Sequence, residues 1–179
     1  MAMLIIFGGL PGTGKTGIGK ALAVRGPRAY VRIDEIEHAL SRLGGNDIGV
    51  AGYVAGHAVA SSNLKLGIDV VADSVNPVPE SREGWRRVAR ETGSAFAEVE
   101  IVCSDEQEHR RRVEGRVADI AGFTLPSWSA VQGRVYAPWT GAGLRIDTAE
   151  LDVAAAVARI EAYLDSLSVR SGSMPGGPA

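Results

Sequence analysis

The stretch GGLPGTGKT at residues 8–16 is the feature of this chain that most restricts how it can fold. It follows the apolar run LIIF and satisfies the pattern G-x-x-x-x-G-K-[ST] from Gly9 to Thr16. Phosphate oxygens need several converging backbone N–H groups, and glycine permits such a nest because it has no Cβ to clash. The stretch therefore predicts a buried strand, a phosphate-binding loop and a helix whose N-terminus faces the anion.

The motif also predicts which residues contact a nucleotide and its metal ion. Lys15 can reach the β- and γ-phosphates, and the Thr16 hydroxyl can coordinate Mg²⁺. The other contacts come from the loop itself. We expect the nucleotide site to comprise Gly9, Leu10, Pro11, Gly12, Thr13, Gly14, Lys15, Thr16 and Gly17.

A second pattern overlaps the first, since Gly12 to Gly17 also reads G-x-G-x-x-G, as in dinucleotide-binding loops. Asp34 could then be the acid that binds a ribose. The geometry argues against this interpretation, because a dinucleotide loop turns tightly just after its strand. Here Pro11, which has no N–H, and several other residues separate Phe7 from Gly12. The dinucleotide interpretation also leaves Lys15 without a role, so we favour the P-loop.

Strand and helix patterns alternate along the chain. This alternation predicts an α/β fold, a three-layer α/β/α sandwich around a parallel sheet. We expect a single domain over residues 4–165, with a lid at about 117–138 and a disordered tail at 168–179. The expected strands are 4–7, 29–33, 68–73, 94–103 and 144–148, and the expected helices are 15–25, 35–43, 52–67, 82–92, 104–120 and 149–167.

Two acids follow predicted strands at the edge of the sheet where the P-loop lies. Asp34 ends the second strand, where a carboxylate can accept the proton of an attacking hydroxyl; alternatively it caps the next helix. Asp73 ends the third strand, where a carboxylate can hold Mg²⁺ directly or through water; alternatively it is an ordinary turn acid. Ser74 and Asn76 just beyond it could face the substrate.

An arginine-rich segment is the candidate source of positive charge over a migrating phosphate. Arg112 and Arg116 are spaced i,i+4, so they share a face of the predicted helix, just before the expected lid. Arg134 is a weaker candidate. Arg82 could bind an anion or lie on the surface. Arg110 and Arg111 are expected to be solvated and to pair with Glu106, Glu108 or Glu114.

The overall composition excludes several kinds of partner. The net charge of −2 gives no basis for broad binding to nucleic acid or anionic membranes. The single cysteine, Cys103, cannot form an internal disulfide. The first residues lack a signal-peptide pattern, and no apolar run approaches the ~20 residues that span a bilayer. We therefore expect a cytoplasmic protein whose partner is a small-molecule substrate.

The segments GGLPGTGKT, RIDEI, VVADSVNPV, HRRRVEGR, VYAPW and RIDT resemble the small bacterial P-loop kinases often labelled AAA family ATPases. Chloramphenicol phosphotransferase, gluconate kinase, shikimate kinase and the polynucleotide kinase domain are relatives. The resemblance covers about residues 4–164. It implies a nucleoside monophosphate kinase-like fold with a five-stranded parallel sheet, a lid and a substrate-binding region at 36–66. It also implies ATP as the nucleotide, Asp34 as general base, Arg116 as the lid arginine and residues 145–148 near the adenine.

Two departures from the sequences of these relatives narrow the range of possible phosphate acceptors. Nucleoside monophosphate kinases usually carry Asp-Gly-x-Pro-Arg after the third strand, and here the sequence is Asp73-Ser-Val-Asn-Pro77. Polynucleotide kinases often have an arginine where Glu37 and His38 stand. We therefore expect an ATP- and Mg²⁺-dependent kinase that phosphorylates a small-molecule hydroxyl. The open alternatives are an antibiotic- or sugar-nucleotide-modifying phosphotransferase or toxin-type kinase, a polynucleotide 5′-hydroxyl kinase and a nucleotide-binding switch without kinase activity.

Overall fold

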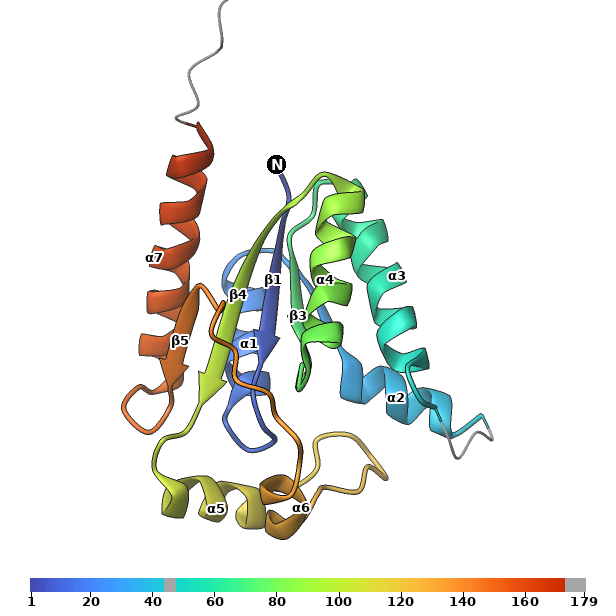
Figure 1. The fold of residues 1–179 in the computed structure, drawn as a ribbon, viewed down its shortest axis with the longest axis vertical. Helices are drawn as coiled ribbons and strands as arrows, with labels where there is room; N and C mark the ends of the chain where they lie inside the picture. Colours follow the sequence, from blue (N-terminus) through green and yellow to red (C-terminus); the bar gives the residue numbers. More distant parts are fainter. Residues whose placement is uncertain (44–47, 173–179) are drawn as a thin grey trace, which may run out of the picture.

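The computed structural model describes residues 1–43 and 48–172 and contains the expected five-stranded parallel sheet (Figure 1). The strand order is β2-β3-β1-β4-β5, so the strand that precedes the glycine loop is central. Every residue of that strand is buried. The strands are β1 (Met3–Gly8), β2 (Ala29–Arg32), β3 (Val70–Asp73), β4 (Ala95–Val102) and β5 (Leu144–Asp147).

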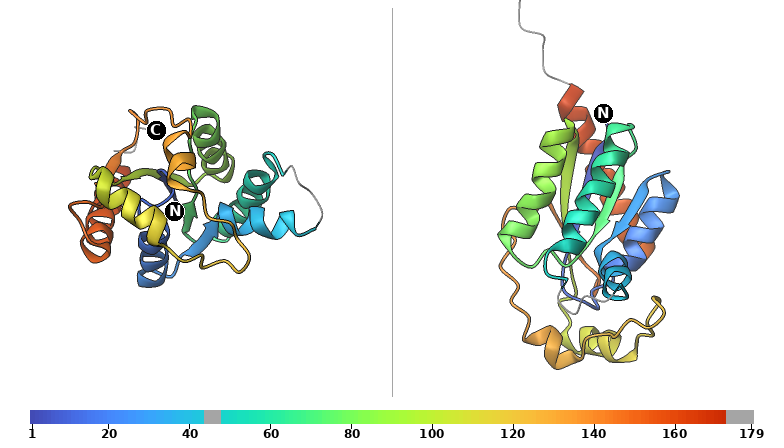
Figure 2. Two further views of the ribbon diagram at one scale, coloured as in Figure 1. Left: turned by 90° about the horizontal axis from the view of Figure 1, so that it is seen from below. Right: turned by 90° about the vertical axis from the view of Figure 1, so that its right-hand side faces the viewer.

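Helices cover both faces of the sheet and confirm the three-layer architecture (Figure 2). Helices α1 (Lys15–Arg25) and α7 (Val153–Gly172) pack on one face, and α3 (Ala51–Lys65) and α4 (Pro79–Thr92) pack on the other. Because side chains alternate along a strand, Ile5 and Phe7 of β1 enter one core while Leu4 and Ile6 enter the other.

Three further helices lie near the carboxyl edge of the sheet, where parallel strands end (Figure 1). They are α2 (Ile33–Ser41), α5 (Glu106–Gly115) and α6 (Trp128–Gln132). Among the described residues, none of the helices has both the length and the apolar character needed to cross a membrane.

The helix predicted at 104–120 is shorter than expected. Helix α5 begins after Asp105, whose carboxylate accepts the Glu108 N–H at 3.0 Å, and it ends at Gly115. Arg116 is already extended, so the prediction that Arg112 and Arg116 share one helix face is wrong. The physical reason is tertiary, because the carboxylate of Asp119 forms ion pairs that draw the chain away from the helix axis toward α1 and β2.

Other boundaries differ by a few residues. Strand β2 ends at Arg32, so Asp34 lies in the first turn of α2, and no side chain caps that helix. The capping alternative for Asp34 is therefore wrong. Helix α4 begins at Pro79, before the predicted start at residue 82. Helix α7 runs to Gly172, so residues 168–172 of the predicted disordered tail are helical, and the rest of that tail, 173–179, lies outside the described residues.

Candidate active site

The glycine loop between β1 and α1 adopts a backbone that only glycine accepts readily. Gly9, Gly12 and Gly14 have φ angles of 145°, 88° and 94°. A Cβ added to Gly9 would lie 2.0 Å from the carbonyl oxygen of Ile101, and one added to Gly12 would lie 2.4 Å from Cγ2 of Val113. The loop therefore needs glycine both for its conformation and for its close packing against β4 and α5.

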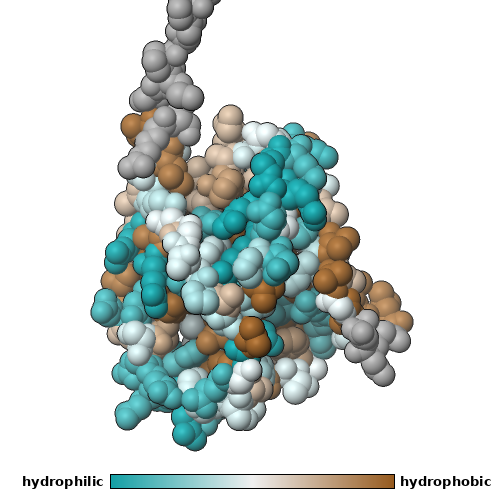
Figure 3. Space-filling view, in the orientation of Figure 1, coloured by the Kyte–Doolittle hydropathy of each residue, from teal (hydrophilic) through white to brown (hydrophobic). Residues whose placement is uncertain are grey.

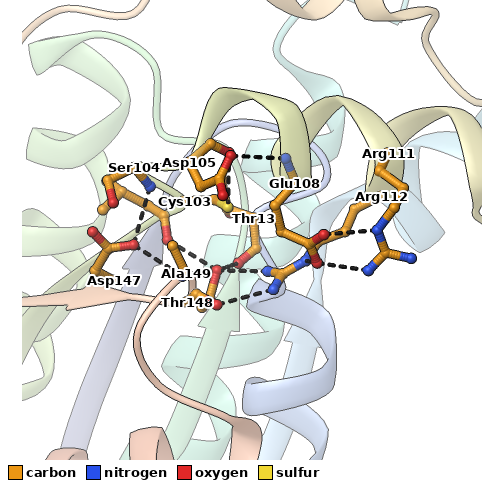
Figure 4. Close-up of polar contacts among 11 residues, drawn as sticks. Thr13, Cys103, Ser104, Asp105, Glu108, Arg111, Arg112, Asp147, Thr148 and Ala149 are labelled. Carbon is orange, nitrogen blue, oxygen red and sulfur yellow. Dashed lines mark hydrogen bonds and ion pairs between the residues drawn. The ribbon is translucent and has the colours of Figure 1, made fainter.

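Side chains of α5 and of the loop after β5 hold the P-loop from outside (Figure 4). Thr148 Oγ1 lies 2.9 Å from the carbonyl oxygen of Thr13. Arg112 donates to Thr148 Oγ1 at 2.8 Å and to its carbonyl oxygen at 2.9 Å. His109 is buried, and its Nε2 lies 2.9 Å from the carbonyl oxygen of Pro11. Arg112 and His109 thus fix the position of the loop as well as bordering it.

The two predicted metal-holding residues are in direct contact. Thr16 Oγ1 donates to Asp73 Oδ2 at 2.8 Å, and the hydroxyl of Tyr30 donates to the same oxygen at 2.6 Å. Asp73 is only 3% exposed. Burial, together with the charge of Asp73, raises the pKa of Tyr30, so its hydroxyl stays protonated and keeps donating. A hydroxyl and a carboxylate side by side form the hard oxygen donor set that fits Mg²⁺.

The described residues contain no cluster of three or more His, Cys, Asp or Glu side chains that could hold a metal by itself. Mg²⁺ commonly binds through one or two carboxylates completed by substrate phosphates. The pair formed by Thr16 and Asp73 therefore fits a metal that arrives with a nucleotide.

Lys15 lies buried at the start of α1, and its Nζ donates to the carbonyl oxygen of Leu10 at 2.8 Å. Burial lowers the pKa of Lys15, while the charges of Asp73 and Asp34 oppose this change. A buried cation held against the loop in this way is placed to meet an anion that enters the nest.

A cavity of about 310 Å³ lies over the loop and is named here the phosphate cavity. It brings together most of the residues predicted from the sequence. Gly9, Leu10 and Thr13 border a separate cavity of about 260 Å³, and Asp73 lies behind Thr16. The phosphate cavity is lined by Pro11, Gly12, Gly14, Lys15, Thr16, Gly17, Arg32, Asp34, Val75, Arg112, Arg116, Phe123, Pro126 and Arg134.

A larger cavity of about 580 Å³, named here the acceptor pocket, lies beside the phosphate cavity and is enclosed by α2, α3 and α4. Asp34, Val75, Phe123 and Arg134 line both cavities. The side chain of Asp34 is 41% exposed, and its Oδ2 lies 3.8 Å from Arg32 Nη2. Asp34 therefore stands where the two cavities meet.

The arginines around the phosphate cavity differ in their partners. Arg116 is half-buried, and its Nε has no hydrogen-bond partner among the described residues. Burial lowers the pKa of Arg116, and the charge of Asp34 opposes this. Arg112 is held by Thr148 and by Glu108 Oε1 at 2.7 Å. Arg116 is thus the freer of the two to engage a bound anion.

Arg32 is a site residue that the sequence reasoning missed. It is buried at the end of β2, lines the phosphate cavity and donates to Asp119 at 2.7 Å. The available signal was its position at the carboxyl end of a parallel strand, two residues before Asp34. Its partner Asp119 belongs to the predicted lid, which was not recognisable as a contact from sequence spacing.

The predicted lid segment, 117–138, borders both cavities through Phe123 and Arg134. Asp119 anchors it to Lys20 of α1 at 2.7 Å as well as to Arg32. His38 Nε2 lies 2.9 Å from the carbonyl oxygen of Ala121. These contacts tie the segment to α1, β2 and α2, on the rim of the site.

Arg82 has neither of the roles considered from the sequence. It is buried and donates to the carbonyl oxygens of Asn76 at 2.9 Å and Pro138 at 3.0 Å. Its guanidinium also stacks on the rings of Tyr136 and Trp139, at 5.3 and 4.7 Å. Arg82 therefore fastens the start of α4 to segment 136–139.

The polar residues that follow β3 face inward. Asn76 is fully buried and donates to the carbonyl oxygen of Phe7 at 2.7 Å, so it supports β1 and does not line either cavity. Ser74 is also buried.

On the surface of α5, Arg110 pairs with Glu114 and Arg111 with Glu108, as predicted.

A glycine nest between the central strand and the first helix, at the carboxyl edge of a sheet of this strand order, defines a P-loop protein with a nucleoside monophosphate kinase-like fold. The model of a family described as an AAA domain matches residues 4–136, and the chain belongs to that family. None of the curated protein sequences matches the chain.

Solved structures share the fold over nearly the whole chain. A provisionally assigned kinase from Chloroflexus aurantiacus is 22% identical with a TM-score of 0.72, covering 92% of this chain and 97% of its own. The Mycobacterium tuberculosis APS kinase, in complex with AMPPNP and APS, is 19% identical with a TM-score of 0.64, covering 92% and 98%. A gluconokinase from Sinorhizobium meliloti is 20% identical with a TM-score of 0.60, covering 92% and 96%. The chain thus has the fold of the small P-loop kinases.

Proposed function

We propose that this protein is an ATP- and Mg²⁺-dependent kinase that transfers the γ-phosphate to a hydroxyl group of a small molecule. The observation that carries the proposal is the position of Asp34. Its carboxylate lines both the phosphate cavity and the acceptor pocket. A base at that junction can reach a hydroxyl in one cavity as it attacks a phosphorus in the other.

The surrounding residues supply the other requirements of phosphoryl transfer. The loop amides and Lys15 hold the phosphates, and Thr16 with Asp73 would hold Mg²⁺, which would supply positive charge to the phosphates. Asp34 accepts the proton of the acceptor hydroxyl. Arg116 provides positive charge over the transferred group, while Arg112 lies on the nucleotide side through its contact with Thr148.

The structural relatives support this reaction class. The APS kinase was solved with AMPPNP and APS, and the gluconokinase has the same fold, so the architecture accommodates nucleotide-dependent kinases. Magnesium is supported by the donor pair of Thr16 and Asp73.

The test is acceptor-stimulated ADP release across a broad panel of alcohols, with the wild type and matched variants. Asp34→Asn should lower kcat at least about a hundredfold without weakening Mg²⁺–ATP binding, since it removes the base together with one negative charge beside the phosphate cavity. Asp165→Asn is the control, because Asp165 is an exposed acid on α7 and lines neither cavity. Full turnover by Asp34→Asn would refute its role, and ATP binding without turnover of any alcohol would favour a nucleotide-binding switch.

A further inference from the structure

The acceptor pocket is a built feature, because glycines on α3 and α4 make room for the side chains that shape it. A Cβ on Gly52 would lie 2.3 Å from Cγ of Glu37, and a Cβ on Gly84 would lie 2.7 Å from Cε1 of His57. Any larger residue at these two positions would displace the side chains of Glu37 and His57 from the pocket wall. The volume of about 580 Å³ is within the range of small-molecule sites.

The walls of the pocket are largely apolar. Val50 and Val54 line it and are 74% and 61% exposed, although valine is usually buried. Figure 3 shows apolar residues on the right-hand edge of the molecule, where Figure 1 places α3. The other apolar lining residues are Ile33, Tyr53, Val75, Pro77, Val78 and Phe123. An occupant with an apolar body would bury this surface.

The half-buried charges in the wall are both acidic. Glu37 lies beside Asp34, and among the described residues it has no hydrogen bond or ion pair. Burial, and then the charge of Asp34, raises the pKa of Glu37, while Arg134 opposes this change. Among the described residues the charged form of Glu37 therefore lacks a close partner, and a cation or hydrogen-bond donor on the occupant would stabilise it.

The basic residues of the lining do not offset this acidity. Arg87 is exposed and lies 4.0 Å from Glu91. Arg134 is exposed and stands at the phosphate end, where it lines both cavities. Burial lowers the pKa of His57 to about 4, so its imidazole is uncharged at neutral pH. The described part of the lining thus has no buried cation that would hold an anionic group of the acceptor.

We propose that the acceptor is an alcohol with an apolar body and no net negative charge, and that Glu37 binds a second polar group on it, an ammonium or a hydroxyl. Phosphorylation of the bound alcohol rests on the proposed kinase function. The preference of the pocket for cationic and neutral alcohols over anionic ones does not. Two carboxylates within a half-buried cavity repel an acid and attract a cation. Glu37 is thus the residue that determines specificity, and Asp34 remains the base.

The test uses three alcohols with the same benzyl group and different charge. Phenylalaninol is a cation, N-acetylphenylalaninol is neutral and 3-phenyllactate is an anion. Their affinities are measured by calorimetry at millimolar concentrations, without nucleotide, so that the result does not depend on turnover. The wild type should bind the cationic and neutral alcohols at least about tenfold more tightly than 3-phenyllactate.

Glu37→Gln should reduce the preference for phenylalaninol over 3-phenyllactate by about tenfold, as expected when one charge at contact distance is removed. A merely structural role would weaken all three affinities together and leave that ratio unchanged. Glu80→Gln is the matched control, because Glu80 lines the same pocket but is exposed, and it should change the ratio little.

Three outcomes would overturn the inference: 3-phenyllactate binds as tightly as the others, Glu37→Gln leaves the ratio unchanged, or none of the three alcohols binds. Failure of the kinase proposal looks different. In that case the charge preference and its dependence on Glu37 persist, but no bound alcohol accepts phosphate from Mg²⁺–ATP.

Discussion

The substitution Gly9→Ala tests whether the phosphate loop depends on the absence of one side chain. Gly9 has a φ of 145°, and its N–H donates to the carbonyl oxygen of Val75 at 3.0 Å. A Cβ at this position would lie 2.0 Å from the carbonyl oxygen of Ile101 and 3.2 Å from Oγ1 of Thr13. The Ile101 oxygen belongs to the backbone of a central strand, so it cannot rotate away as a side chain would.

Two effects set the expected magnitude. A non-glycine residue in a sparsely populated backbone region costs about 1–3 kcal/mol. Overpacking against a rigid neighbour costs about 1–3 kcal/mol more. We expect the free energy of unfolding to fall by about 4 kcal/mol. For a chain of this size, each 1 kcal/mol lowers Tm by roughly 2–4 °C, so Tm should fall by roughly 10 °C.

The assay is urea unfolding followed by circular dichroism, with Gly67→Ala as the matched control. Gly67 also has a positive φ, 81°, but a Cβ there would meet no atom within 4 Å. The free energy of unfolding of Gly67→Ala should therefore fall only by the cost of the backbone conformation, about 1 kcal/mol. Mg²⁺–ATP affinity, measured in parallel, should fall for Gly9→Ala and stay unchanged for Gly67→Ala. Equal destabilisation of the two variants would refute the argument from Ile101.

Three further predictions concern side chains whose surroundings only the tertiary structure shows. The pKa of His57 is about 4 in the folded protein against 6.5 when unfolded, so stability is fully present above pH 6.5 and falls as the pH drops toward 4; urea titrations should show a loss of about 1–2 kcal/mol that is absent in His57→Leu. Arg82→Lys should lower the free energy of unfolding, measured by thermal unfolding, by about 2–4 kcal/mol, whereas Arg87→Lys should change it little. Arg82 donates hydrogen bonds to carbonyl oxygens inside the protein, but Arg87 is exposed. Hydrogen bonds from Arg32 and from Lys20 of α1 lower the pKa of Asp119. Asp119→Asn should therefore speed amide exchange in 117–127 above pH 4, with a loss in the free energy of unfolding of at most about 1 kcal/mol. Unchanged exchange would contradict the role of Asp119 as an anchor of this segment.

The parts of the site that the sequence predicted follow from local backbone rules. The glycine pattern alone predicts a nest, because positive φ angles at Gly9, Gly12 and Gly14 are a property of the loop itself. The contact of Thr16 with Asp73 follows from one topological rule, that parallel strands end at the same edge of a sheet. These residues could therefore be placed before any tertiary contact was known.

The residues that the sequence misplaced or missed depend on contacts between distant segments. Arg32 lines the phosphate cavity and is held there by Asp119, which lies far along the chain. Arg82 is buried because segment 136–139 folds over it. Helix propensity continued α5 to residue 120, but the ion pairs of Asp119 favour a chain that leaves the helix after Gly115.

The sequence by itself determined the strand–loop–helix unit at the phosphate loop and the layered fold around a parallel sheet. Both arise from neighbouring residues and their periodicity. Only the tertiary structure decided the chemistry of the acceptor pocket. Glu37 and His57 are placed there by the close approach of three helices at Gly52 and Gly84. Burial then raises the pKa of Glu37 and lowers that of His57, and burial is a property of the packed fold and not of any one segment.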